Sequence, residues 1–195
     1  MKLETAEHIN NVVRQSVLTS HNADSCVASI FVLRDVLRIG FSVEAHPRAV
    51  TLLIFNPYVT NLINEGLTDF KKICEEAHSE KGWSVGVGFG KQEGPKKWPG
   101  HLIAITKDSE GLLLWDTSLD QASRPHKDMN LGPLVHRVPT DPYDGGFISL
   151  MLRKCMLVYQ PKKASESLLE GVPDWTRSAR LKQSVDRSLT LLGVL

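Results

Sequence analysis

Three residues of this chain have the types and the order of a thiol-dependent catalytic site. Cys26 follows a short polar segment and opens a stretch with helical apolar spacing. His101 opens a later strand-like segment, and Asp116 lies at the end of the next one. A cysteine thiolate is a strong nucleophile, a histidine can move protons for it, and a carboxylate can orient the histidine ring. This set therefore predicts acyl-transfer chemistry at Cys26.

The segment around Cys26 predicts a helix that begins at the thiol. Apolar residues recur at helical spacing over 27–39, Asp24 or Ser25 is available as N-cap, and Gly40 is the expected stop. Unpaired N–H groups at a helix N-terminus favour negative charge, so they stabilise a thiolate. The same N–H groups can supply half of an oxyanion hole.

A predicted hairpin brings the histidine and the aspartate together. Residues 101–107 and 111–117 both have strand composition, and 108–111 has the composition of a turn between them. The outer ends of two hairpin strands meet, so His101 and Asp116 should be neighbours.

The remaining elements must hold this site in place. Helical spacing is found over 5–19 and 58–79, and strand composition over 41–55 (one strand irregular at Pro47, or two short ones), 83–89, 134–138 and 147–159. We expect an α+β domain over 1–161, with N-terminal helices packed on an antiparallel sheet. The tail, 162–195, contains an amphipathic helix that we expect to pack on the same domain.

Several residues near the three are weaker candidates. Asn22 or His21 could add a side-chain donor to the oxyanion hole, and Trp98 could line the cleft or simply pack as an ordinary core tryptophan. The loop 90–99, rich in glycine, proline and lysine, is a candidate lid. Each of the three main residues also has a purely structural interpretation: Cys26 as an inert core cysteine, His101 as an ordinary strand histidine and Asp116 as the first residue of a turn.

Other kinds of site find little support. Cys74 and His78 have ligand-like spacing, but two ligands are too few for a structural zinc site, so we expect no metal. The glycine-rich run 86–90 lacks the helix of a dinucleotide-binding fingerprint, and no Gly-x-Ser-x-Gly elbow occurs, so we expect no bound cofactor and no serine hydrolase.

Composition and charge narrow the class of protein. The 195 residues are 42% apolar and 23% charged, as in a single globular domain. A formal charge of +1 predicts neither nucleic acid nor an anionic membrane as a partner. Neither an export signal nor a membrane-spanning run of roughly 20 apolar residues is visible, so we expect a soluble, cytoplasmic protein. Three cysteines without a close pair fit a reducing compartment.

The ordered set resembles the transglutaminase-like branch of the papain-like cysteine enzymes, an arrangement that arylamine N-acetyltransferases share. The matching pieces are DSCVAS, WPGHLIAIT and LLLWDTSLDQ, spread over roughly residues 20–123. The resemblance implies Cys26 as nucleophile, His101 as general base and acid, and Asp116 as the residue that orients the histidine. It also implies a thioester intermediate that water or an amine resolves.

The sequence thus favours a thiol-dependent hydrolase or acyltransferase acting on an amide, peptide or isopeptide bond. Its partners would be a protein, a peptide or a small amide. Two alternatives stay open: a papain-like binding module without activity, and a small-molecule acyltransferase that uses acyl-coenzyme A. The substrate and the oligomeric state are left open.

Overall fold

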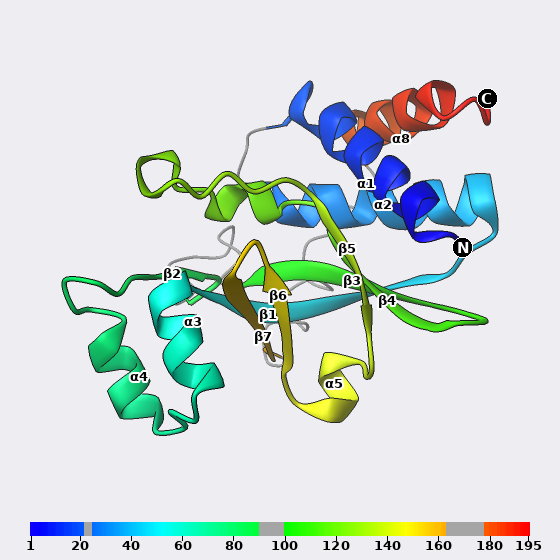
Figure 1. The fold of residues 1–195 in the computed structure, drawn as a ribbon. Coiled ribbons are helices and arrows are strands. Elements are labelled where there is room, and N and C mark those ends of the chain that lie inside the picture. The colour runs from blue at the N-terminus through cyan, green and yellow to red at the C-terminus, as the bar shows by residue number, and fades with distance from the viewer. Residues whose placement is uncertain (22–24, 90–99, 163–177) are drawn as a thin grey trace.

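A computed structural model describes residues 1–21, 25–89, 100–162 and 178–195. It combines a curved antiparallel sheet with a layer of helices on one side and a pair of short helices on the other (Figure 1). The helices are α1 (Leu3–Leu18), α2 (Cys26–Phe41), α3 (Pro57–Asn64), α4 (Phe70–Glu76), α5 (Pro142–Gly145) and α8 (Ala179–Leu191). The strands are β1 (Ala45–Phe55), β2 (Ser84–Val87), β3 (His101–Asp108), β4 (Gly111–Asp116), β5 (Leu134–Val138), β6 (Ile148–Leu152) and β7 (Cys155–Pro161). The expected α+β class is confirmed.

The strand β1 organises the sheet, whose order is β5-β4-β3-β1-β7-β6. The first half of β1 pairs with β3, ending at the pair Val50↔His101. Its second half pairs with β7 on one edge and with β2 on the other. The sheet therefore curls toward a barrel, and β2 follows β3 along the same edge of β1 at the level of His101.

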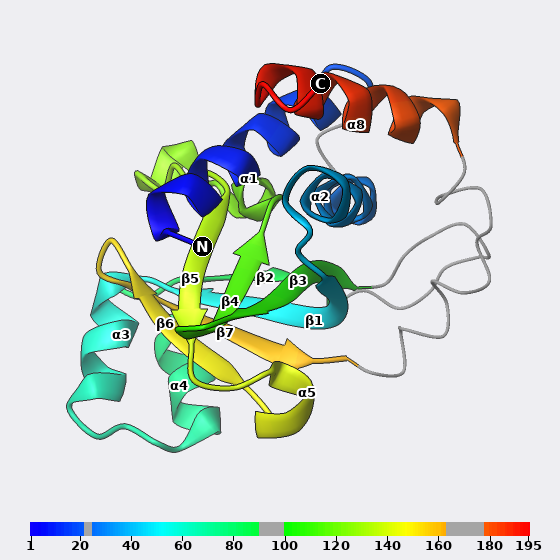
Figure 2. The same ribbon diagram turned by 90° about the vertical axis from the view of Figure 1, so that its right-hand side faces the viewer.

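The helices α1 and α2 cover one face of the sheet, and α8 packs on these two helices (Figure 2). The apolar stripes of α1 and α2 meet the sheet in a core that contains the fully buried Ile30, Leu33 and Trp115. From the tail, α8 buries Leu181 and Leu189 in the same core. Apolar burial of this kind is the main term that holds α2, and with it Cys26, against the sheet.

The helix α2 does not stop at Gly40, as the sequence suggested. It continues to Phe41, and Ser42 takes the left-handed conformation that ends it, with φ of 54°. Gly40 has a packing role instead, because a Cβ there would lie 3.0 Å from a methyl carbon of Leu189 on α8. Glycine thus permits the close approach of two helices.

Two other segments are divided where the sequence pattern suggested one element. The expected helix 58–79 is two helices, α3 and α4, separated at Gly66, whose φ is 107°. The expected strand 147–159 is the hairpin β6–β7, which turns at Arg153 and Lys154. Both residues have positive φ, a conformation that usually selects glycine or asparagine, so their residue types do not indicate this turn.

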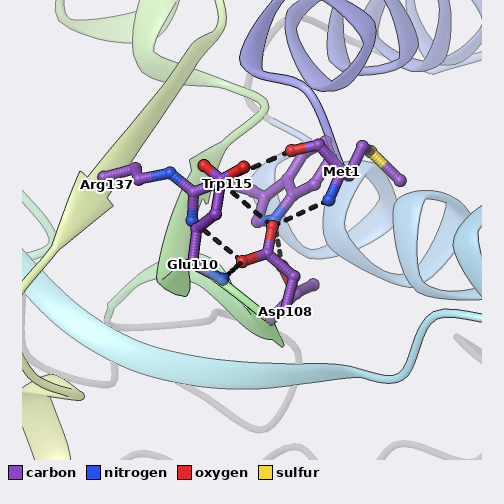
Figure 3. Close-up of polar contacts among 6 residues, drawn as sticks. Met1, Asp108, Glu110, Trp115 and Arg137 are labelled. Atoms are coloured by element: carbon purple, nitrogen blue, oxygen red, sulfur yellow. Dashed lines mark hydrogen bonds and ion pairs between the residues drawn. The ribbon is translucent and has the colours of Figure 1, made fainter.

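Charged groups fix the turn of the β3–β4 hairpin (Figure 3). Asp108 accepts hydrogen bonds from Arg137 of β5 at 2.9 and 3.1 Å and from the amino group of Met1 at 2.9 Å. Arg137 and then the amino group hold the pKa of Asp108 well below its usual range. Because Asp108 pairs with Gly111, the cluster helps to fix the hairpin register that places His101 and Asp116 at the other end.

Within the described residues, no helix combines the length and the hydropathy needed to cross a membrane.

Candidate active site

Cys26 is the first residue of α2, and its side chain is 7% exposed. The first backbone bond within the helix runs from the N–H of Ser29 to the carbonyl of Ser25, so the N–H groups of residues 26–28 are not used by the helix. Ser25 occupies the N-cap position without a side-chain capping bond. The thiol therefore lies beside backbone donors that suit an anion.

His101 and Asp116 form a buried pair at one end of the hairpin. The distance from His101 Nε2 to the nearer carboxylate oxygen of Asp116, Oδ2, is 2.8 Å, and the two residues are 1% and 0% exposed. The pairing Ala104↔Trp115 makes them diagonal neighbours on one face of the two strands. The contact follows from the hairpin spacing.

The carboxylate of Asp116 receives two further donors. The hydroxyl of Tyr159 on β7 donates to the same Oδ2 over 3.0 Å, and the backbone N–H of Ser118 donates to Oδ1 over 3.2 Å. Because a buried carboxylate is costly without donors, these bonds both stabilise it and fix its orientation.

The imidazole of His101 lies between Asp116 and Cys26. Burial by itself lowers the pKa of His101, but the Asp116 carboxylate, and after it the Cys26 side chain, raise it to about 10. With Nε2 on Asp116, Nδ1 is the nitrogen left for the thiol, and Nδ1 makes no hydrogen bond of good geometry with any residue that the structure describes, Cys26 included. The Asp116 carboxylate thus favours the imidazolium form of His101 at neutral pH.

A buried arginine joins the helix that bears the thiol to the loop that follows Asp116. Arg14 of α1 is 2% exposed; it donates to the hydroxyl of Ser29 over 3.2 Å and to the carboxylate of Asp120 over 2.8 Å. Ser29 lies one turn after Cys26 on α2, and Asp120 lies in the short 3-10 helix Leu119–Ala122. Arg14 thus links the two halves of the site.

The weaker candidates for the oxyanion hole and the cleft are not joined to the central site by any described contact. His21 lies after α1, where burial and the charge of Arg180 lower its pKa, and no described contact joins it to the three central residues. Asn22, Trp98 and the candidate lid 90–99 lie outside the described residues. No described group of three or more histidine, cysteine or acidic side chains has the geometry of a metal site.

Gly88, in the glycine-rich run that lacks a dinucleotide-binding fingerprint, lies against the start of β3 and positions His101. Its φ is 82°, and a Cβ there would lie 2.6 Å from the backbone nitrogen of His101 and 3.0 Å from the carbonyl oxygen of Val50. The contacts are with backbone, so they cannot be relieved by a side-chain rotation. Only glycine lets β2 end this close to the start of β3.

We expect Gly88→Ala to lower the free energy of unfolding by about 2–3 kcal/mol, because it combines a strained φ with a backbone clash. Gly86→Ala is the matched control, since its Cβ would meet side chains alone, the exposed ring of Phe89 at 3.0 Å and a methyl carbon of Leu53 at 3.9 Å. Urea unfolding of both variants measures the difference. Equal stabilities would show that the approach to His101 is not constrained.

Sequence reasoning missed Tyr159, Arg14 and Gly88. Alternation along β7 could have placed Tyr159 inward, since Cys155, Leu157 and Tyr159 are the buried positions. Arg14 lies one helical turn after Asn10 beside the apolar stripe of α1, and both are buried. No local pattern points to Gly88, because its clash is with distant backbone.

Comparisons with protein-family models, with curated proteins and with solved structures found no match.

Proposed function

We propose that this protein is a thiol-dependent hydrolase or acyltransferase that forms a thioester at Cys26 from an amide, peptide or isopeptide substrate. One observation carries the proposal: a fully buried imidazole has a carboxylate on one nitrogen and a helix N-terminal thiol at its other side. In a purely structural core, a charged imidazole would bring no gain in stability, because burying a charge is costly.

The fold of the proposed enzyme is papain-like, of the transglutaminase-like branch. What supports this is the order of the parts: a cysteine that opens a helix, a histidine that opens a strand packed under it, and an aspartate that ends the adjacent strand. In this proposal the helices α3 and α4 are an insertion between the cysteine helix and the histidine strand.

The first half-reaction would acylate Cys26. The thiolate attacks the carbonyl carbon and forms a C–S bond, and the backbone N–H groups at the start of α2 hold the oxyanion. As the tetrahedral intermediate collapses, the C–N bond breaks and His101 gives its proton to the leaving amine.

The second half-reaction would release the acyl group. His101, now neutral, takes a proton from water or from an acceptor amine as that nucleophile attacks the thioester. The C–S bond then breaks, Cys26 leaves as thiolate and His101 is again protonated. Asp116 keeps the ring in place through both halves.

The experiment that tests the proposal is to trap the acyl-enzyme. The protein is incubated with an activated acyl ester and with short peptide amides, quenched in acid and mapped by mass spectrometry. We expect one acyl group on the peptide that contains Cys26, removable by hydroxylamine as a thioester. The variant Cys26→Ala, which retains Cys74 and Cys155, should gain none.

Acylation spread equally over the three cysteines, or unchanged in His101→Ala, would contradict the proposal. Either result would leave a binding module as the better account.

A further inference from the structure

Tyr159 is a fully buried tyrosine whose hydroxyl has no role in the two half-reactions above. It lies on β7, opposite Leu52 of β1 and Ile148 of β6, so two strand spacings separate it from His101. Its hydroxyl nevertheless reaches Asp116 Oδ2 at 3.0 Å, the oxygen that also receives His101 at 2.8 Å. One carboxylate oxygen thus serves two donors.

We propose that Tyr159 is a positioning residue of this site, whose hydroxyl fixes the Asp116 carboxylate and moderates its attraction for the His101 ring. The inference rests on the proposed function for its catalytic meaning, but the attraction itself can be measured in the resting protein.

The hydroxyl can act only as a donor here. Burial, and then the Asp116 carboxylate, raise the pKa of Tyr159 well above 10, so the phenol keeps its proton at neutral pH. Tyr159 therefore does not exchange protons with the site. Its hydrogen bond partly neutralises the negative charge on Asp116 Oδ2. The carboxylate therefore stabilises the His101 imidazolium less strongly.

The groups that set the protonation of His101 are few among the described residues. Asp116 of β4 and Cys26 of α2 face the ring, while Tyr159 of β7 and the ring itself face Asp116. Arg14 of α1 is engaged with Asp120 and Ser29. Removing the Tyr159 hydroxyl changes one of these influences and leaves the others in place.

A weaker attraction between Asp116 and the His101 imidazolium suits a histidine that must both give and take a proton. An imidazole bound too strongly as imidazolium gives its proton to a leaving amine slowly and becomes a base for water only at high pH. A second donor on the carboxylate shifts this balance toward proton release.

The test is the titration of His101, followed by NMR on the free protein with selectively labelled histidine. We expect Tyr159→Phe to raise the pH at which His101 titrates by about half a unit to one unit. Tyr58→Phe is the matched control, because the Tyr58 hydroxyl also donates to a carboxylate, that of Glu76 at 2.9 Å, away from the site. It should leave His101 unchanged.

A second substitution strengthens the Tyr159–Asp116 hydrogen bond instead of removing it, and it deletes no atom from the core. Fluorotyrosine at position 159 is a stronger donor, so His101 should titrate at lower pH than in the unmodified protein. This arm keeps the proposal testable if Tyr159→Phe fails to fold. If His101 titrates at the same pH in both altered proteins, Tyr159 only fills space and the proposal is wrong.

The two proposals fail separately. A shift in the titration of His101 together with an unreactive Cys26 would leave Tyr159 as a positioning residue in a site that is not catalytic. Where acyl transfer is observed, the rise of the deacylation rate with pH should move to higher pH in Tyr159→Phe.

Discussion

Replacing His101 by alanine should slow the alkylation of Cys26 by iodoacetamide at least about tenfold near pH 5. A thiol with an ordinary pKa of about 8.5 is thiolate to only about three parts in ten thousand at that pH. In the proposed enzyme, the imidazolium of the His101–Asp116 pair would supply the countercharge that stabilises a Cys26 thiolate. The lower intrinsic nucleophilicity of such a thiolate offsets only part of this gain.

Cys74 provides an internal comparison for the alkylation rate of Cys26. Cys74 is half-buried, more exposed than Cys26 at 7%, so accessibility alone predicts that Cys74 reacts faster. The proposed ion pair predicts the reverse order below neutral pH. Mass spectrometry of each cysteine peptide measures both rates in one sample. His136→Ala, which removes an exposed histidine on β5, should change neither, and a matching loss in that variant would contradict the account.

Asp116→Asn should have the second large effect, on acylation rate and on stability together. The amide cannot stabilise the imidazolium or select its orientation, so acylation should fall by about 10²- to 10⁴-fold. The loss of one partner of a fully buried pair should also lower the free energy of unfolding by about 3 kcal/mol. Stopped-flow acylation and urea unfolding measure the two effects.

The stability loss should depend on pH in a definite direction. The folded-state pKa of His101 is raised, to about 10, above its unfolded value near 6.5. Its contribution is therefore fully present below about pH 6.5 and is lost as the pH rises toward 10. The gap between wild type and Asp116→Asn should narrow over that window. Asp35→Asn, which alters a partly exposed pair with Arg34, should cost under about 1 kcal/mol at every pH; a gap as large as that of Asp116→Asn would count against the buried pair.

The hairpin that joins His101 to Asp116 was predictable because residues close together in the sequence determine it. Two apolar segments and one turn set the register, and the pairing Asp108↔Gly111 confirms the turn. The start of α2 at Cys26 was predictable for the same reason, since the apolar spacing begins there.

The parts that the sequence did not predict depend on contacts between distant segments. Gly40 was expected to end α2 but serves the packing of α8, and Gly88 is required by the backbone of His101. Tyr159 reaches Asp116 from a strand that joins the sheet on the far side of β1. A single sequence contains no signal for such contacts, because each depends on how the strands are ordered in space.

The far-ultraviolet absorbance of the thiolate, compared between wild type and Cys26→Ala near pH 6, distinguishes the proposed ion pair from an ordinary buried thiol. A free thiol is almost wholly protonated there, given its pKa of about 8.5. If the ion pair exists, the absorbance difference should equal about one thiolate per molecule, and His101→Ala should remove it at the same pH. If the difference emerged only near pH 8 to 9, Cys26 would be an ordinary buried thiol and the proposed enzyme would be contradicted.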